Sequence, residues 1–284
     1  MKSWSRNERL VWIAGLLLTL SVGYLNHGII ALDDYSEGFA RFIPAQNITY
    51  QENMDSSGIR LPFQSLLLLF LSKCALGLGL NQPTDQLRFV LMLIGALVFC
   101  AHTCTARSFF KDSRERMIAL TLTSFYFILP LIYSRPLIEN LSGAFVSLAA
   151  FCAFKFYREE RSQWVGFSVF FISLAALFRF QSGICILALP LLFFIKPSKS
   201  AWFVFLLSCL LGLLGTGLLD LFLTGGFHRS LFAYVDYNIH HASSYGTTPF
   251  YTFLLLFLGL SIPPAFLGRY RGFQWKERYS DLLP

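Results

Sequence analysis

The chain has 284 residues, of which 55% are hydrophobic, 17% aromatic and only 14% charged, and its mean hydropathy is +0.56. Charged residues make up about a quarter of a soluble domain, so this composition excludes a soluble domain, a disordered chain and a nucleic-acid-binding protein. In a membrane protein, the net charge of +7 indicates first of all which connections face the cytoplasm. Six cysteines lie in apolar runs without CxxC pairs or zinc-spaced histidines, which predicts buried free thiols rather than disulfides or metal ligands.

Nine apolar runs predict a polytopic helical membrane protein, because lipid leaves backbone groups unpaired outside helices and closed barrels. In chain order the runs are Leu10–Leu25, Leu61–Leu80, Phe89–Thr105, Met117–Tyr133, Leu137–Phe154, Trp164–Phe178, Gly183–Ile195, Ala201–Leu223 and Phe250–Leu267. No small-residue cleavage site follows the first run before Asp33, so we expect this run to be retained as a span.

The basic residues predict which connections face the cytoplasm. Of the 23 lysines and arginines, 16 lie in the N-terminal segment, in the connections near 107–116, 155–161 and 196–199, and in the C-terminal tail. By the positive-inside tendency, all five segments are cytoplasmic. An even number of crossings must then separate the N-terminus from the 107–116 connection, although three apolar runs lie between them.

Leu61–Leu80 is the run that we expect not to cross. It starts beside Pro62 and carries Lys73, and a lysine in a span costs about 2.5–3.5 kcal/mol on insertion. We therefore predict an all-α membrane protein of about eight spans with both termini in the cytoplasm. Its first outer loop covers 26–86 and includes an interfacial or re-entrant helix at 61–80, and a second large outer loop covers 225–249.

Four polar connections share the non-cytoplasmic face in this topology, at 26–60, 134–140, 179–182 and 225–249. Asp33 and Asp34 directly follow the first span. Adjacent carboxylates can supply a general base, bind a metal or simply be solvated, and the residues alone favour the solvated interpretation.

Isolated arginines recur at the ends of three apolar runs, as Arg60, Arg135 and Arg179. Their recurrence suggests a phosphate site, and snorkelling of single arginines is the alternative. Glu139 lies four residues after Arg135, so a local ion pair between the two at a helix start is a further alternative.

The 225–249 connection is rich in aromatic and polar residues, which is typical of an interfacial aromatic belt and also fits substrate binding. Its candidate binding residues are Asp236, Asn238, His241 and Tyr245. His240 and His241 are adjacent and point in different directions in a helix or strand, so we predict no metal site. Asp220, in the preceding apolar run, requires a partner or water.

Four sequence blocks resemble the polyprenyl-phosphate-mannose-dependent mannosyltransferases of glycosyltransferase family 22, which have the GT-C fold. Leu32-Asp33-Asp34-Tyr35 stands where that family has a Pro-Asp-Glu type signature, and Ile59-Arg60-Leu61-Pro62 resembles its Ile-Arg-Ser…Pro block. Ser134-Arg135-Pro136…Glu139-Asn140 is similar to its Ser-Arg-Thr…Asn…Glu block. The most specific block runs from Tyr237 to Tyr251 and resembles Asn…Tyr-Gly-x-His-Pro-Trp-x-Trp-Tyr, with Thr248 in place of histidine and Phe250 in place of tryptophan.

The resemblance implies an inverting, metal-independent sugar transfer without a cofactor. Asp33 would deprotonate an acceptor hydroxyl, with Asp34 in support, and Arg60, Arg135 and Arg179 would bind the donor phosphate. The expected substrate-binding residues are Glu139, Gln181, Asp236, Asn238, His241 and Tyr245. The implied partners are a polyprenyl- or dolichyl-phosphate sugar, with mannose as the implied sugar, a glycan or glycolipid acceptor, and the lipid bilayer.

The implied location is the bacterial inner membrane or the endoplasmic reticulum, with the active site on the non-cytoplasmic side. Relative to this family we expect the chain to be shortened at its C-terminus. One alternative is a multispan transporter or flippase, although neither mid-span polar residues nor an internal repeat stands out. Another is a different GT-C activity, such as transfer of glucose, arabinose or galactose, or an acyltransferase.

Overall fold

The structure is a computed structural model that describes residues 4–25, 61, 63–241 and six positions between 249 and 258. The chain divides into two compact units, Met1–Val235 and Asp236–Pro284, which we describe separately. Within the described residues all regular structure is helical. In chain order the helices are α1 (Arg6–Leu25), α3 (Phe63–Gly77), α4 (Pro83–Phe109), α5 (Ser113–Phe125), α6 (Leu129–Tyr133), α7 (Ile138–Glu159), α8 (Gln163–Phe178), the 3-10 helix η3 (Phe180–Leu187), α9 (Ala188–Ile195), α10 (Lys199–Thr224) and α11 (Arg229–His241).

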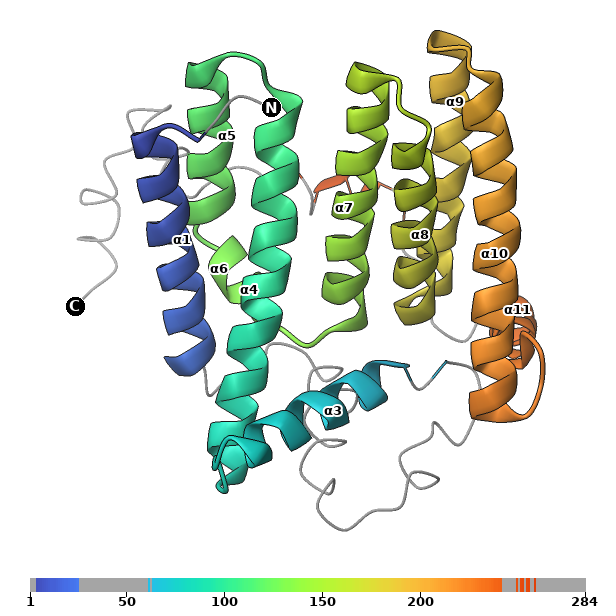
Figure 1. Cartoon of the computed structure of the whole chain (residues 1–284). Coiled ribbons are helices and arrows are strands. Elements are labelled where there is room, and N and C mark those ends of the chain that lie inside the picture. Colours follow the sequence, from blue (N-terminus) through green and yellow to red (C-terminus); the bar gives the residue numbers. More distant parts are fainter. Residues whose placement is uncertain are drawn as a thin grey trace. The chain divides into compact units, whose positions relative to one another are not determined.

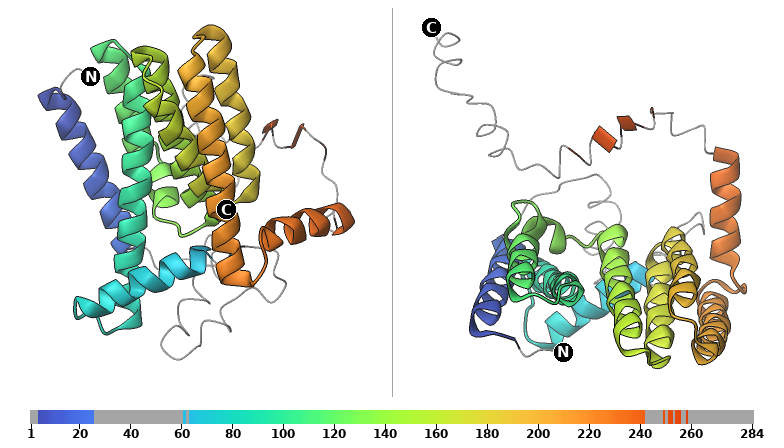
Figure 2. Two further views of the ribbon diagram at one scale, coloured as in Figure 1. Left: turned by 45° about the vertical axis from the view of Figure 1, so that its right-hand side comes forward. Right: turned by 90° about the horizontal axis from the view of Figure 1, so that it is seen from above.

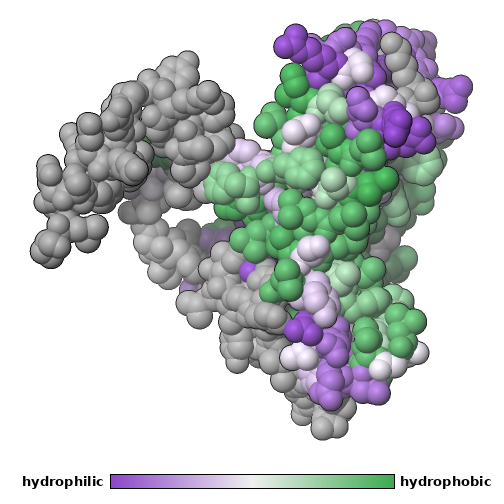
Figure 3. Space-filling model, turned by 90° about the vertical axis from the view of Figure 1, so that its left-hand side faces the viewer, coloured by the Kyte–Doolittle hydropathy of each residue, from purple (hydrophilic) through white to green (hydrophobic). Residues whose placement is uncertain are grey.

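Four of these helices, α1, α4, α7 and α10, are long and apolar enough to cross a membrane. The prediction of a helical membrane protein is confirmed at this level. Figure 3 shows one face on which apolar side chains form a band between two hydrophilic ends. The remaining apolar helices, including α3 and α8, are shorter, so the total of about eight spans stays a prediction.

The long helices of the first unit run side by side, whereas α3 lies across one end of them (Figures 1 and 2). The start of α1 and the connections α4–α5, α7–α8 and α9–α10 share the opposite end, drawn uppermost in Figure 1. We call this the basic end, because Arg6, Arg9 and the basic residues of those three connections lie there. The position of α3 relative to a membrane stays a prediction.

A stripe of small residues places α1 against its neighbours. Gly15, Thr19 and Gly23 are buried, four residues apart, while Leu17 and Leu18 between them are exposed. A Cβ added at Gly15 would lie 2.5 Å from the Cβ of Ser124 on α5, and one at Gly23 would lie 3.3 Å from the backbone of Leu91 on α4. Small residues at this spacing let helix backbones approach closely in a membrane, where packing rather than water exclusion drives association.

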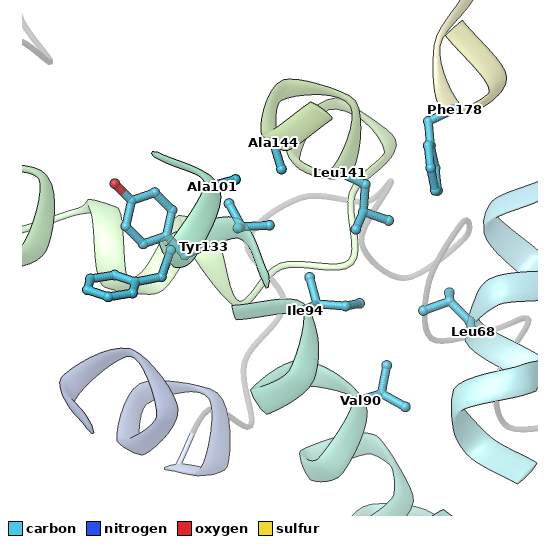
Figure 4. Close-up of a cluster of buried hydrophobic side chains, with 10 residues drawn as sticks. Leu68, Val90, Ile94, Ala101, Tyr133, Leu141, Ala144 and Phe178 are labelled. Atoms are coloured by element: carbon cyan, nitrogen blue, oxygen red, sulfur yellow. The ribbon is translucent and has the colours of Figure 1, made fainter. Parts of the chain in front are cut away.

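The buried side chains form two clusters that share α7. The first, shown in Figure 4, joins α3, α4 and α7 and includes Leu68, Ile94 and Leu141. The second joins α7 to α8, α9 and α10 and includes Phe156 and Val169. Both faces of α7 are thus covered, which makes it the central helix of the first unit.

Two predicted segments differ in detail from the structure. The expected span Met117–Tyr133 is interrupted, because α5 ends at Phe125 and α6 begins at Leu129. Pro130 lies in the first turn of α6, and proline neither donates a backbone hydrogen bond nor favours helical geometry in the residue before it. The expected outer loop at 225–249 contains the helix α11.

The Asp220 carboxylate holds the turn between α10 and α11. It is 1% exposed, its Oδ2 accepts from the backbone N–H of Ser230 at 2.8 Å, and its Oδ1 accepts from the hydroxyls of Ser230 and Thr224. The partner that a carboxylate in this run requires is therefore supplied by the turn itself. All six cysteines are free, with Cys152 buried and the others partly exposed.

Candidate functional site

The predicted site residues divide into three groups. Asp33, Asp34, Arg60 and Tyr245 lie outside the described residues. The second group comprises Arg135, Glu139, Arg179 and Gln181, which belong to the first unit, and the third comprises Asp236, Asn238 and His241, which belong to the second.

Arg179 is the centre of a polar cluster at the end of the bundle opposite the basic end. It is the extended residue between α8 and η3, and its backbone N–H donates to the carbonyl of Ala175 at 2.9 Å. Its Nη1 donates to Oε1 of Glu139 at 2.6 Å, and its Nε donates to Oε1 of Gln181 at 3.2 Å. The amide of Gln181 in turn donates to the hydroxyl of Tyr234 on α11. The structure therefore brings together three of the predicted site residues from segments about 40 residues apart in sequence.

These side chains line a cavity of about 110 Å³. Its remaining wall is apolar, with Leu61 and Phe180 among its members. Pockets that hold a drug-sized ligand measure about 300–1,000 Å³, so this cavity suits a group the size of a phosphate rather than a whole lipid-linked sugar.

The Arg179–Glu139 ion pair leaves Arg179 able to bind a ligand. The two side chains are 38% and 50% exposed, and an ion pair so open to water contributes no more than about 1 kcal/mol. A guanidinium has five N–H donors, of which this cluster uses Nη1 and Nε. Nη2 has no partner among the described residues, so it is available to an incoming anion.

Arg135 lies elsewhere. It is 2% exposed and is not among the residues that line the Arg179 cavity in the described part of the chain. Because α7 begins at Ile138, Arg135 precedes the helix, and the partner observed for Glu139 is Arg179. A local helical pair between Arg135 and Glu139 therefore does not describe this turn, and a shared phosphate site for Arg135 and Arg179 stays a prediction.

The turn that carries Arg135 is fixed by its neighbours. The amide of Asn140 donates to the carbonyl oxygens of Ile132, Tyr133 and Arg135 at 2.8–3.0 Å. The amide of Gln64, on α3, donates to the carbonyl of Pro136. These contacts satisfy carbonyls in and after the last turn of α6, and that of Ile132 also accepts from the backbone N–H of Arg135.

The predicted residues of the second unit are exposed on α11, and their described contacts are made within that helix. His240 Nδ1 lies 2.9 Å from the carbonyl and 3.3 Å from the carboxylate of Asp236. His241 stacks on Tyr237, with ring centroids 4.5 Å apart. The adjacent histidines thus have different partners, and the described residues contain no group of three or more potential ligands placed to hold a metal ion.

Two residues of this region were not predicted as site residues. Tyr234 is 53 residues from Gln181 in sequence, and nothing in the aromatic composition of 225–249 distinguishes it from the other tyrosines there. Asn140 directly follows Glu139, but its contacts to three carbonyls depend on the break between α6 and α7.

Comparison with known protein families, characterised proteins and solved structures found no match.

Proposed function

We propose that this protein is an integral-membrane glycosyltransferase that transfers a sugar, with mannose the first candidate, from a polyprenyl-phosphate carrier to a glycan or glycolipid. The observation that carries the proposal is the half-exposed Arg179 beside Glu139 and Gln181 in a cavity that Leu61 also lines. Arg60 is the chain neighbour of Leu61, and the Asp33-Asp34 block lies in the same connection. The position of Leu61, next in sequence to Arg60, on the wall of the Arg179 cavity supports the proposal.

Each described residue of the cavity has a role in the proposed reaction. Arg179 binds the phosphate of the donor through Nη2 and stabilises the negative charge that grows on it as the sugar leaves. Glu139 and Gln181 hold the guanidinium by its Nη1 and Nε. Because the ion pair is open to water, the phosphate need not displace a buried carboxylate in order to bind.

The proposed reaction is a single inverting substitution at the anomeric carbon of the donor sugar. Asp33 accepts the proton of the acceptor hydroxyl, and the oxygen forms a bond to the anomeric carbon. The bond from that carbon to the phosphate oxygen breaks, and the polyprenyl phosphate leaves with the electron pair. Asp34 supports the base, and the phosphate charge is met by Arg179 and Arg60.

The test measures sugar transfer from radiolabelled polyprenyl-phosphate donors into the lipid-linked or glycan fraction. Membranes contain the full chain, the variants Asp33→Asn and Arg179→Gln, or the control Arg229→Gln. Arg229 is exposed on α11 and does not line the cavity, so its substitution removes the same charge without touching the site. Donors carrying mannose, glucose, galactose and arabinose are compared in parallel.

We expect loss of transfer in Asp33→Asn, and roughly a 100-fold or greater decrease in Arg179→Gln, since removing one preorganised donor to a developing charge typically costs that much. Arg229→Gln should retain activity within about twofold. Transfer that survives Asp33→Asn in a folded variant would refute the role of the base. The absence of transfer from every donor would favour the transporter alternative.

A further inference from the structure

A second cavity, at the basic end of the first unit, is larger than the Arg179 cavity and has a different character. It has a volume of about 390 Å³ and is lined by residues at the end of α4, around the start of α5 and at the end of α7. Five of its lining residues are basic, namely Arg107, Lys111, Arg116, Lys155 and Arg158. We call it the basic cavity.

The carboxylates near the basic cavity do not balance its positive charge. Glu8 contacts both Arg107 and Arg116, and Glu159 contacts Lys155. Lys111 and Arg158 form no ion pair within the described part of the chain. Among the described residues, the ion pairs of these five cations use two carboxylates, and Asp112 is a third carboxylate near Arg116. The remaining excess of positive charge in one concave site favours the binding of an anion.

An apolar groove adjoins the basic cavity. It has a volume of about 510 Å³ and is lined by α7, α8, η3 and α9, with Ala150, Ala153 and Leu189 among its residues. Phe154 lines both spaces, and the guanidinium of Arg158 lies over its ring, 4.3 Å from the centroid. The charged site and the apolar groove thus meet at one aromatic side chain.

We infer that these two spaces form a binding site for one anionic phospholipid, with the headgroup phosphate in the basic cavity and an acyl chain in the apolar groove. Basic pockets between membrane helices on the positively charged side of a protein match anionic headgroups. The positive-inside tendency accounts for basic residues in these connections, but it does not require them to line a cavity that continues into an apolar groove. A soluble anion would use the basic cavity and leave the groove without a role.

The proposal predicts that Lys111 and Arg158 bind lipid and that two neighbouring basic residues do not. Arg114 lies three residues from Lys111 and Arg161 lies three residues from Arg158, and both are exposed and outside the basic cavity. The double variant Lys111→Gln/Arg158→Gln and its control Arg114→Gln/Arg161→Gln remove the same total charge from the same connections. They differ in whether the charge lines the cavity.

The experiment titrates the purified full chain, in neutral detergent, with dioleoyl phosphatidylglycerol and counts bound lipid by native mass spectrometry. Dioleoyl phosphatidylcholine provides the zwitterionic comparison, and glycerol phosphate provides the headgroup without chains. Ala153→Leu fills the groove without changing charge, and Ala150→Leu serves as a second variant. Thermal unfolding of each variant confirms that it is folded.

We expect the unaltered chain to bind one phosphatidylglycerol with about tenfold or greater preference over phosphatidylcholine, since charge-assisted hydrogen bonds distinguish the two headgroups. Lys111→Gln/Arg158→Gln should weaken phosphatidylglycerol binding about tenfold, and the Arg114/Arg161 control should change it by less than about twofold. Ala153→Leu should weaken it roughly tenfold by excluding the chain.

Three results would overturn the proposal. Equal binding of phosphatidylglycerol and phosphatidylcholine would show that the site does not recognise an anionic headgroup. Equal weakening by the control pair would show that the net charge of the connections, rather than the basic cavity, attracts lipid. Displacement of lipid by glycerol phosphate at equal concentration would show that the groove contributes nothing and that the site binds a soluble anion.

Discussion

Substitution of Glu8 is the most informative test of how the first unit is held together. Its carboxylate is 1% exposed, and Oε1 accepts from Nε of Arg116 at 2.7 Å while Oε2 lies 3.4 Å from Nη2 of Arg107. Glu8 also forms a capping box with Ser5, in which each backbone N–H donates to the other side chain. One carboxylate therefore joins the start of α1 to both α4 and α5.

The expected loss in Glu8→Gln follows from the burial of the two arginines. Opposite unit charges about 4 Å apart attract by about 4 kcal/mol at an effective dielectric constant near 20, and desolvation offsets much of this gain. Removing one partner alone is costly, because Arg107 and Arg116 are 4% and 7% exposed and would lose the buried carboxylate that they share. We expect the free energy of unfolding to fall by about 3–5 kcal/mol. The glutamine amide can preserve the capping box, so most of this loss reports the missing charge.

The assay is equilibrium unfolding of the full chain in mixed detergent micelles, followed by tryptophan fluorescence. Trp4 is a local probe, because the guanidinium of Arg107 lies 4.5 Å from its ring centroid. Glu115→Gln is the matched control, since Glu115 is exposed in the first turn of α5, and it should change the free energy of unfolding by less than about 0.5 kcal/mol. A double-mutant cycle with Arg116→Gln should give a coupling energy above about 1 kcal/mol. A loss below about 1 kcal/mol in Glu8→Gln, or additive effects in the cycle, would refute this account.

Three further predictions concern stability and use the same unfolding measurement. Gly15→Ala should lower the free energy of unfolding by about 1–3 kcal/mol, because its Cβ would lie 2.5 Å from a side-chain atom of α5. Gly143→Ala, with nothing within 4 Å, should not destabilise the protein, and similar losses for both would contradict the close approach. Asp220→Ala should cost about 1–3 kcal/mol by leaving a buried backbone N–H of α11 unpaired, whereas an unchanged value would show that water replaces the carboxylate. Backbone N–H groups in the first turn of α5, that of Glu115 foremost, lower the pKa of Asp112. The stabilisation by Asp112 is therefore complete above about pH 4 and is lost as the pH falls through its lowered pKa. The loss of unfolding free energy in Asp112→Ala should shrink on acidification. A loss that does not change with pH would argue against this cap.

The long helices could be predicted from apolar run length alone, because a span must bury about 20 residues whatever its neighbours are. The break before α6 could not, although Pro130 marks it, since proline also occurs within membrane helices when neighbours satisfy the freed carbonyl. The stripe of Gly15, Thr19 and Gly23 is visible in the sequence. Its partners on α4 and α5 are not, because they depend on how the helices cross.

Individual residues of the candidate site could be predicted from the sequence, but the contacts between them could not. Polar side chains at span ends are conspicuous in an apolar sequence, and Arg179, Glu139 and Gln181 are of this kind. Their mutual contacts depend on the return of α8 alongside α7, which places residues 40 apart within hydrogen-bonding distance. Arg135 matched the same pattern, yet the turn at Pro136 places it among buried groups.

Burial distinguishes the arginines of this protein more sharply than sequence does. Arg107 and Arg116 are almost fully buried and share Glu8, so their charges serve the contacts between α1, α4 and α5. Arg179 also has a carboxylate partner, but its side chain is 38% exposed, and an ion pair in water can be exchanged for a ligand at little cost. The same substitution to glutamine should therefore lower stability at Arg116 and lower phosphate binding, with the fold intact, at Arg179. Arg179 is thus paired and still in contact with solvent, which suits a residue that exchanges its partner for a phosphate.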